Sequence, residues 1–179
     1  MTALIDMGYS GLKKIISGGQ VGVDRGALCG ALAFGVATGG CAPLGWRTTN
    51  GSAPELGSLY GLIEHTSPDY PPRTEENVLA GDGTLLIYSN GNSAGTVLTR
   101  KLCLKHSKPR CEIEIPFTKL WDPANNIAKV AEWVVQNEIE VLNVAGNHEK
   151  AVYHEALTFE IVIKILQELD RVGMVQKII

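Results

Sequence analysis

The sequence lacks the patterns that mark membrane, secreted and metal-binding proteins. No apolar run approaches the ~20 residues that a membrane helix requires, and no basic segment precedes an apolar one at the amino terminus, as it would in a signal peptide. The four cysteines show no CxxC spacing, and the four histidines stand at no recognised ligand spacing with cysteine or carboxylates. We therefore expect a cytoplasmic protein with reduced thiols, no membrane partner and no protein-bound metal.

The sequence also lacks an excess of basic charge. Sixteen Lys and Arg stand against nineteen Asp and Glu, which gives a formal net charge of −3. A broad nucleic-acid-binding face needs clustered basic residues, so we expect no nucleic-acid partner, although one basic pocket is still permitted. With 179 residues, the chain is long enough to bury one core. We expect a single domain over residues 1–179, with its core at about 13–169.

Short apolar runs alternate with amphipathic segments along the chain. The apolar runs predict strands at residues 13–17, 36–38, 84–88 and 140–144, with a short strand at 62–64 and an alternating edge strand at 110–115. The amphipathic segments predict helices at residues 24–34, from 74 to about 80 and at 96–106. A further helix is expected to start at residue 122, and a long final helix follows residue 149 and ends near residue 169. This order predicts an α/β, Rossmann-like fold, in which a mostly parallel sheet carries helices on both faces. Residues 39–70 are expected to form a long loop.

A glycine-rich turn follows the first predicted strand. It reads Ser17-Gly18-Gly19-Gln20-Val21-Gly22-Val23-Asp24-Arg25. Glycines let the backbone approach a ligand, and the helix that starts near Asp24 would point free N–H groups at a phosphate or similar oxyanion. Close packing of helix on strand explains the same glycines about as well. The spacing is neither GxGxxG nor GxxxxGK[ST], so neither standard nucleotide motif applies.

Two further turns of small residues follow later strands. Residues 89–96 offer Ser89, Gly91, Gly95 and Thr96, and the turn at 145–149 begins with Ala145 and Gly146. Hydroxyls and glycines at a helix start can bind phosphate oxygens or cap the helix. Because the carboxyl ends of parallel strands lie along one edge of a sheet, we expect all three turns to form one pocket for a phosphorylated ligand.

Arginines could supply charge to this pocket. Arg73, Thr74 and Asn77 stand at a predicted helix start that would face the same edge, and Arg25 belongs to the first turn. A solvated surface position explains each of these side chains equally well when it is taken singly.

Four segments together resemble the molybdenum cofactor carrier proteins, a family of the Rossmann-like SLOG superfamily. They are ISGGQVGVDRGAL at residues 16–28, GGCAP at 39–43, RTEENV at 73–78 and LNVAG at 142–146. The resemblance implies a homo-oligomer, a dimer or tetramer, that holds molybdenum cofactor (molybdopterin) as cargo and passes it to molybdoenzymes. That cofactor is a pterin with a phosphate and a molybdate-like head. The expected ligand-binding residues are Ser17, Gly18, Gly19, Gln20, Gly22, Asp24, Arg25, Gly40, Arg73, Thr74, Asn77, Ser89, Gly91, Gly95, Thr96 and Gly146.

The same superfamily contains enzymes, the cytokinin-activating phosphoribohydrolases, with a PGGxGTxxE pattern. Here the matching stretch ends in Ala94-Gly95-Thr96-Val97-Leu98-Thr99, so Thr99 stands at the glutamate position and cannot serve as a carboxylate acid or base. No catalytic residue is assigned, although Asp24, Glu75 or Glu76 could enter the pocket from another turn. Three hypotheses follow, in this order: a cofactor carrier, a nucleoside monophosphate phosphoribohydrolase and a nucleotide sensor.

Overall fold

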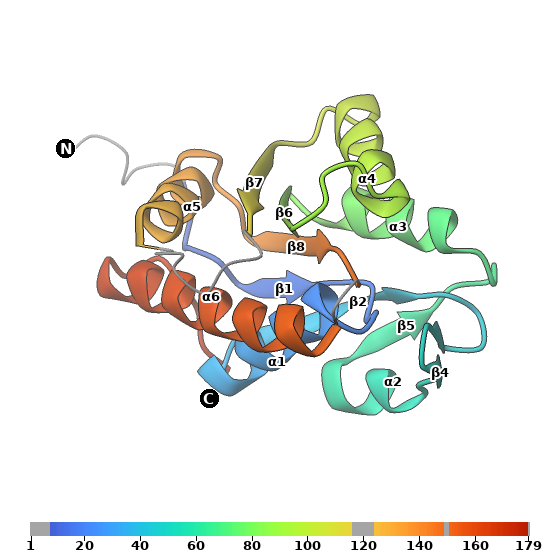
Figure 1. Cartoon of the computed structure of the whole chain (residues 1–179). Coiled ribbons are helices and arrows are strands. Elements are labelled where there is room, and N and C mark those ends of the chain that lie inside the picture. The colour runs from blue at the N-terminus through green and yellow to red at the C-terminus, as the bar shows by residue number, and fades with distance from the viewer. Residues whose placement is uncertain (1–7, 116–123, 149–150, 179) are drawn as a thin grey trace.

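The computed structural model describes residues 8–115, 124–148 and 151–178, and a six-stranded parallel sheet forms its centre (Figure 1). The strand order is β5-β2-β1-β8-β6-β7, and every pairing in this sheet is parallel. The strands are β1 (Lys14–Ile16), β2 (Ala37–Ala42), β5 (Leu62–Glu64), β6 (Gly83–Tyr88), β7 (Arg110–Glu114) and β8 (Val141–Gly146). The predicted α/β Rossmann-like fold is confirmed.

Helices cover both faces of the sheet. On one face α6 packs against both α1 and α5, and on the other face α3 packs against α4 (Figure 1). Their bounds are α1 (Val23–Phe34), α3 (Tyr70–Ala80), α4 (Ala94–Lys105), α5 (Ala124–Gln136) and α6 (Ala151–Arg171). The first turn of α5 was predicted from Asp122 and Pro123, which lie outside the described residues.

The main core lies between the sheet and the α1–α5–α6 layer. Leu85 and Ile87 of β6 and Leu142 of β8 are almost fully buried there, as continuous apolar strands of a two-sided parallel sheet should be. Helix α6 contributes Ile161 and Leu166 to this core, whereas its Phe159 is 37% exposed.

The predicted loop at residues 39–70 is wrong in most of its length. β2 runs on to Ala42, and the segment then forms the hairpin of β3 (Arg47–Thr48) and β4 (Gly51–Ser52), the helix α2 (Glu55–Tyr60) and β5. The predicted short strand at 62–64 is present. The residues from Gly39 to Ala42 have few large side chains, so they carry little apolar signal, although Gly39 pairs with β1 and the next three residues pair with β5.

The start of α3 also differs from the prediction. The helix begins at Tyr70, not at Thr74, and prolines occupy its first positions. Proline lacks an N–H group, and the first turn of a helix has no acceptor for one, so Pro71 and Pro72 fit there without cost. Thr74 lies one turn into the helix, where its hydroxyl donates to the carbonyl of Tyr70 at 2.9 Å.

No helix in the described part of the chain has both the length and the apolar character needed to cross a membrane. The four cysteines are free thiols.

Candidate ligand-binding site

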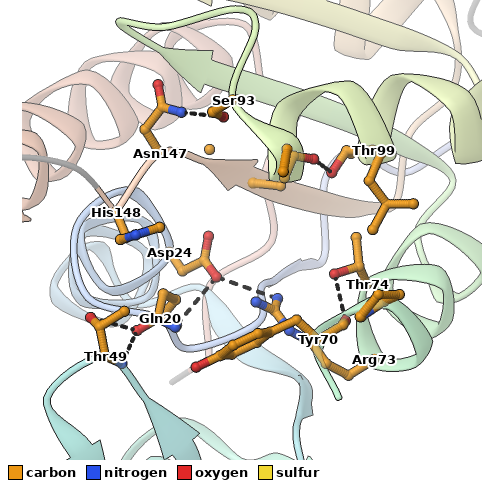
Figure 2. Close-up of a pocket in the computed structure, with 16 residues that line it drawn as sticks. Gln20, Asp24, Thr49, Tyr70, Arg73, Thr74, Ser93, Thr99, Asn147 and His148 are labelled. Carbon is orange, nitrogen blue, oxygen red and sulfur yellow. Dashed lines mark hydrogen bonds and ion pairs between the residues drawn. The ribbon is translucent and has the colours of Figure 1, made fainter.

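A cavity of about 560 Å³ lies at the carboxyl edge of the sheet (Figure 2). Six of the predicted site residues line it: Gln20, Asp24, Arg73, Thr74, Gly95 and Gly146. Ten further lining residues were not among the predicted ones: Thr49, Tyr70, Pro71, Ser93, Ala94, Leu98, Thr99, Ala145, Asn147 and His148. The three strand-to-helix turns therefore do meet at one cavity, and α3 and the β3–β4 hairpin complete its wall.

A buried ion pair lies at the centre of the cavity wall. Arg73 of α3 places Nη1 3.6 Å from Oδ2 of Asp24, and the same oxygen accepts a hydrogen bond from the Gln20 N–H at 3.2 Å (Figure 2). Asp24 is only 5% exposed. Burial raises the pKa of Asp24 above its usual range, while Arg73, the Gln20 N–H and Ser17 act in the opposite direction. The pocket thus offers one buried carboxyl group whose charge is partly compensated.

Arg73 fills the space that the first glycine turn leaves open. A Cβ atom on Gly18 would lie 1.5 Å from Nη1 of Arg73, so a side chain at this position would displace the guanidinium. Three N–H groups of this turn have partners within the protein. Gln20 donates to Asp24, Val21 to the Gln20 side chain at 3.1 Å, and Val23 to the carbonyl of Asn147 at 3.4 Å. The first turn therefore binds the protein's own cation and has little room for an external anion.

The second turn, residues 89–96, is open to the cavity. Ser93 caps α4, because its Oγ accepts a hydrogen bond from the N–H of Thr96 at 3.4 Å. The N–H groups of Ala94 and Gly95 follow this cap, and within the described residues they have no acceptor. A Cβ atom added to Gly95 would meet nothing within 4 Å. The amino end of α4 thus presents two free N–H groups and a partial positive charge to the cavity.

The model of the circularly permutated YpsA SLOG family matches residues 15–164. The chain belongs to this family. A crystal structure from Syntrophus aciditrophicus SB, named "Putative molybdenum carrier protein", is similar with 33% sequence identity and a TM-score of 0.75. The match covers 88% of this chain and 94% of that one. No curated protein matches the chain.

Other predicted site residues of this SLOG protein lie outside the cavity lining. Ser17 donates to the carbonyl of Val144 at 2.6 Å, and Asn77 binds both the N–H and the carbonyl of Cys41, at 2.8 and 3.0 Å. Arg25 pairs with Glu55 at 3.5 Å on the surface. The cavity lining does not include any of the following predicted residues: Ser17, Gly18, Gly19, Gly22, Arg25, Gly40, Asn77, Ser89, Gly91 and Thr96.

Several of these residues shape the second turn of the SLOG pocket. Thr96 is almost completely buried, and its Oγ1 lies 2.9 Å from the Ser93 Oγ. The Gly91 carbonyl accepts a hydrogen bond from Arg100 at 2.5 Å. Ser89 offers its backbone N–H to Asn147 at 2.8 Å. These residues fix the course of the loop that leads into α4.

Two parts of the lining come from elements that sequence patterns placed incorrectly. Tyr70 and Pro71 line the cavity because α3 begins four residues earlier than predicted. Thr49 lies between β3 and β4 and donates its N–H to the Gln20 Oε1 at 2.9 Å. The proline pair was the available signal for the first error, since prolines are typical of a helix start. Thr49 carried no comparable signal, because its contact depends on a hairpin.

Of the three acid and base candidates of this SLOG protein, one lines the cavity and two do not. Glu75 does not face the cavity, since its carboxylate binds Lys105 at 2.7 Å and His106 at 2.6 Å. Glu76 is likewise outside the lining, so Asp24 is the carboxylate among the described lining residues. Thr99 lines the cavity and donates to the Gly95 carbonyl at 2.9 Å. No three His, Cys, Asp or Glu side chains of the described residues are grouped as metal ligands.

Proposed function

We propose that this SLOG protein binds a phosphorylated ligand in the cavity and carries it without cleaving it, with molybdenum cofactor as the cargo. One observation carries the proposal. Ala94 and Gly95, whose N–H groups have no acceptor among the described residues, line the cavity, while the position that holds the glutamate of the phosphoribohydrolases is occupied by Thr99. Phosphate binding is supported by the first feature, and cleavage is disfavoured by the second.

The rest of the cavity suits a flat, oxygen-rich ring. Its volume of about 560 Å³ falls within the ordinary range for small-molecule sites. Pro71 and Leu98 give one part of the wall apolar surface, and polar groups such as Thr49 and Gln20 lie in the same lining. A pterin or a nucleobase needs both features. The residues fit the phosphate and the ring of the cargo, and a molybdate-like head would find no cluster of metal ligands among the described residues.

The name of the Syntrophus protein favours the pterin over the nucleotide. That protein is named as a molybdenum carrier, and it shares 33% identity over nearly its whole length with this chain. We therefore rank the carrier first, with molybdoenzymes as recipients and with a homo-oligomer, a dimer or tetramer, as the expected state.

Native mass spectrometry of the purified protein tests the proposal directly. We expect a copurified phosphorylated pterin, or uptake of added molybdopterin, and no release of adenine from added AMP. The matched control is Gly95→Asp, which places a carboxylate beside the free N–H groups in open space and should abolish anion binding while the fold persists. Failure of the wild-type protein to take up any phosphorylated ligand would refute the proposal.

A phosphoribohydrolase is the second candidate, and one observation favours it. Asp24 is a buried carboxyl group in the cavity wall with a raised pKa, which is what a general acid requires. Release of adenine from AMP by the wild-type protein, lost in Asp24→Asn but retained in Glu75→Gln, would establish the enzyme and displace the carrier.

A further inference from the structure

The carboxamide of Asn147, immediately after β8, uses its whole hydrogen-bonding capacity on the second turn. Its Oδ1 accepts from the backbone N–H of Ser89 at 2.8 Å and of Asn90 at 3.0 Å. Its Nδ2 donates to the Ser93 Oγ at 2.7 Å, to the Thr96 Oγ1 at 3.3 Å and to the Asn90 carbonyl at 3.4 Å (Figure 2 shows the bond to Ser93). A primary amide has two acceptor sites and two donors, so the side chain is saturated.

These five bonds hold both ends of the loop that leads into α4. Ser89 and Asn90 begin the loop, and Ser93 and Thr96 form the cap at its end. The direction of the free N–H groups of Ala94 and Gly95 depends on that cap. Asn147 is only 3% exposed, so its hydrogen bonds are shielded from competing water.

Asn147 also reaches the first turn. Its backbone carbonyl accepts the N–H of Val23 at the start of α1, at 3.4 Å. The preceding Gly146 makes this approach possible, because a Cβ atom there would lie 1.9 Å from the Ile87 carbonyl oxygen and 2.8 Å from a methyl group of Val23. One residue thus connects all three turns at the carboxyl edge.

We propose that Asn147 is a positioning residue, which holds the second turn in the conformation that presents the Ala94 and Gly95 N–H groups to an anion. The identity of the anion that these N–H groups bind rests on the proposed function, whereas the hydrogen bonds of Asn147 to the loop do not depend on it. Loss of the carboxamide should therefore weaken binding of the phosphate group of a ligand and leave binding of its ring unchanged.

Asn143 offers a matched control on the same strand. It is 2% exposed, and its carboxamide donates to the Thr84 Oγ1 at 3.2 Å without touching the loop. Replacement of either asparagine by alanine removes a buried carboxamide from β8 or its end. Only Asn147→Ala removes the bonds to the second turn.

The first experiment follows amide hydrogen exchange by NMR in the ligand-free protein. In Asn147→Ala the amides of Ser89 and Asn90 should exchange faster than in the wild type, whereas Asn143→Ala should leave them unchanged. Asn147→Asp keeps an acceptor oxygen and should restore their protection. If Asn147→Ala does not fold, Asn147→Ser replaces it, because a serine hydroxyl is too short to reach the loop. Unchanged exchange at both amides would overturn the proposal, whether or not any ligand binds.

The second experiment uses AMP and adenosine as probes in calorimetry. In Asn147→Ala we expect AMP to bind about tenfold more weakly, the equivalent of roughly one net hydrogen bond, with adenosine affinity unchanged. Asn143→Ala should change neither affinity. Equal weakening of both probes would show a merely structural role and contradict the proposal. If wild-type protein binds no phosphorylated probe, the proposed function fails, and the exchange experiment still decides the role of Asn147.

Discussion

The first and second turns of the pocket look alike in sequence and differ in what fills them. Both follow a central strand, both are rich in small residues and both lead into a helix. The space over Gly18 is occupied by the guanidinium of Arg73, whereas the space over Gly95 is empty. In the first turn the N–H groups of Gln20, Val21 and Val23 are bound internally, and those of Ala94 and Gly95 are not.

This contrast shows that a glycine in such a turn allows another group to pack close to the backbone, but that the sequence does not identify this group as a protein side chain or a ligand. At Gly18 this group is the side chain of Arg73 from α3, far along the sequence, and the turn accommodates the buried ion pair of Arg73 and Asp24. At Gly95 no protein group approaches, and the turn stays available to a ligand. Substitutions that act on one turn only can break or sharpen this comparison.

The largest effect is expected from Arg73→Gln. The variant leaves the Asp24 carboxylate buried without its cation, and breaking such a pair costs about 3 kcal/mol of unfolding free energy at pH 7. Urea unfolding at pH 7 and pH 4 measures this cost. The pKa of Asp24 is already raised by burial, and loss of Arg73 raises it further. A raised carboxyl pKa lowers stability as pH rises from the unfolded value towards the folded one, so the loss should be smaller at pH 4.

Arg25→Gln is the control for this prediction. Arg25 pairs with Glu55 at 3.5 Å, and the glutamate side chain is 50% exposed, so the pair is largely screened by solvent. Its removal should cost less than about 1 kcal/mol at either pH. Equal losses at the two arginines would mean that the first turn contains no special ion pair.

Gly18→Ala should have the next largest effect, a loss of about 2 kcal/mol, because the new methyl group forces the Arg73 guanidinium away from Asp24. Combination with Arg73→Gln provides the decisive measurement. Without the guanidinium, the nearest obstacle to the methyl group is gone and only the Asp24 Oδ2, at 2.9 Å, stays close. The double variant should therefore lose less stability than the sum of the single variants, by roughly 1 kcal/mol. Additive losses would show that Gly18 is needed for some other reason.

Sequence patterns predicted the fold because its central strands are continuous apolar runs, such as residues 84–88, that a two-sided parallel sheet must bury. Convergence of the turns followed from the same topology. The patterns failed at residues 39–42, where small residues form a strand through pairing with β1 at Gly39 and with β5 from Gly40 to Ala42. There, local composition was a weaker guide than tertiary context. They also failed at Tyr70, although the proline pair that begins the helix was a local signal.

The individual contacts of the site were harder to predict than its location. Arg73 was expected near the ligand, but its occupation of the space over Gly18 depends on the exact path of α3. Asn147 carried no local signal, since its partners Ser89 and Ser93 lie more than fifty positions earlier in the chain. The packing explanation for the first turn and the ligand explanation for the second therefore could be separated only in three dimensions.

Gly95→Ala repeats the Gly18 substitution in the second turn and should have the opposite sign. The methyl group enters open space at the second position of α4, and alanine favours a helix over glycine by up to about 1 kcal/mol. Thermal unfolding should therefore show equal or higher stability. Calorimetry should show weaker AMP binding, because the methyl group narrows the approach to the N–H groups. A destabilised protein would indicate that some group does pack over Gly95.

The smallest effect is expected from Thr99→Val, which keeps the shape of the side chain and removes its hydroxyl. Thr99 donates to the Gly95 carbonyl at 2.9 Å within α4, so the loss should be about 0.5 kcal/mol in urea unfolding. AMP binding should be unchanged if this hydroxyl serves the helix. Weaker AMP binding at unchanged stability would instead assign the hydroxyl to the ligand, and the anion site of the second turn would then extend one helical turn further along α4.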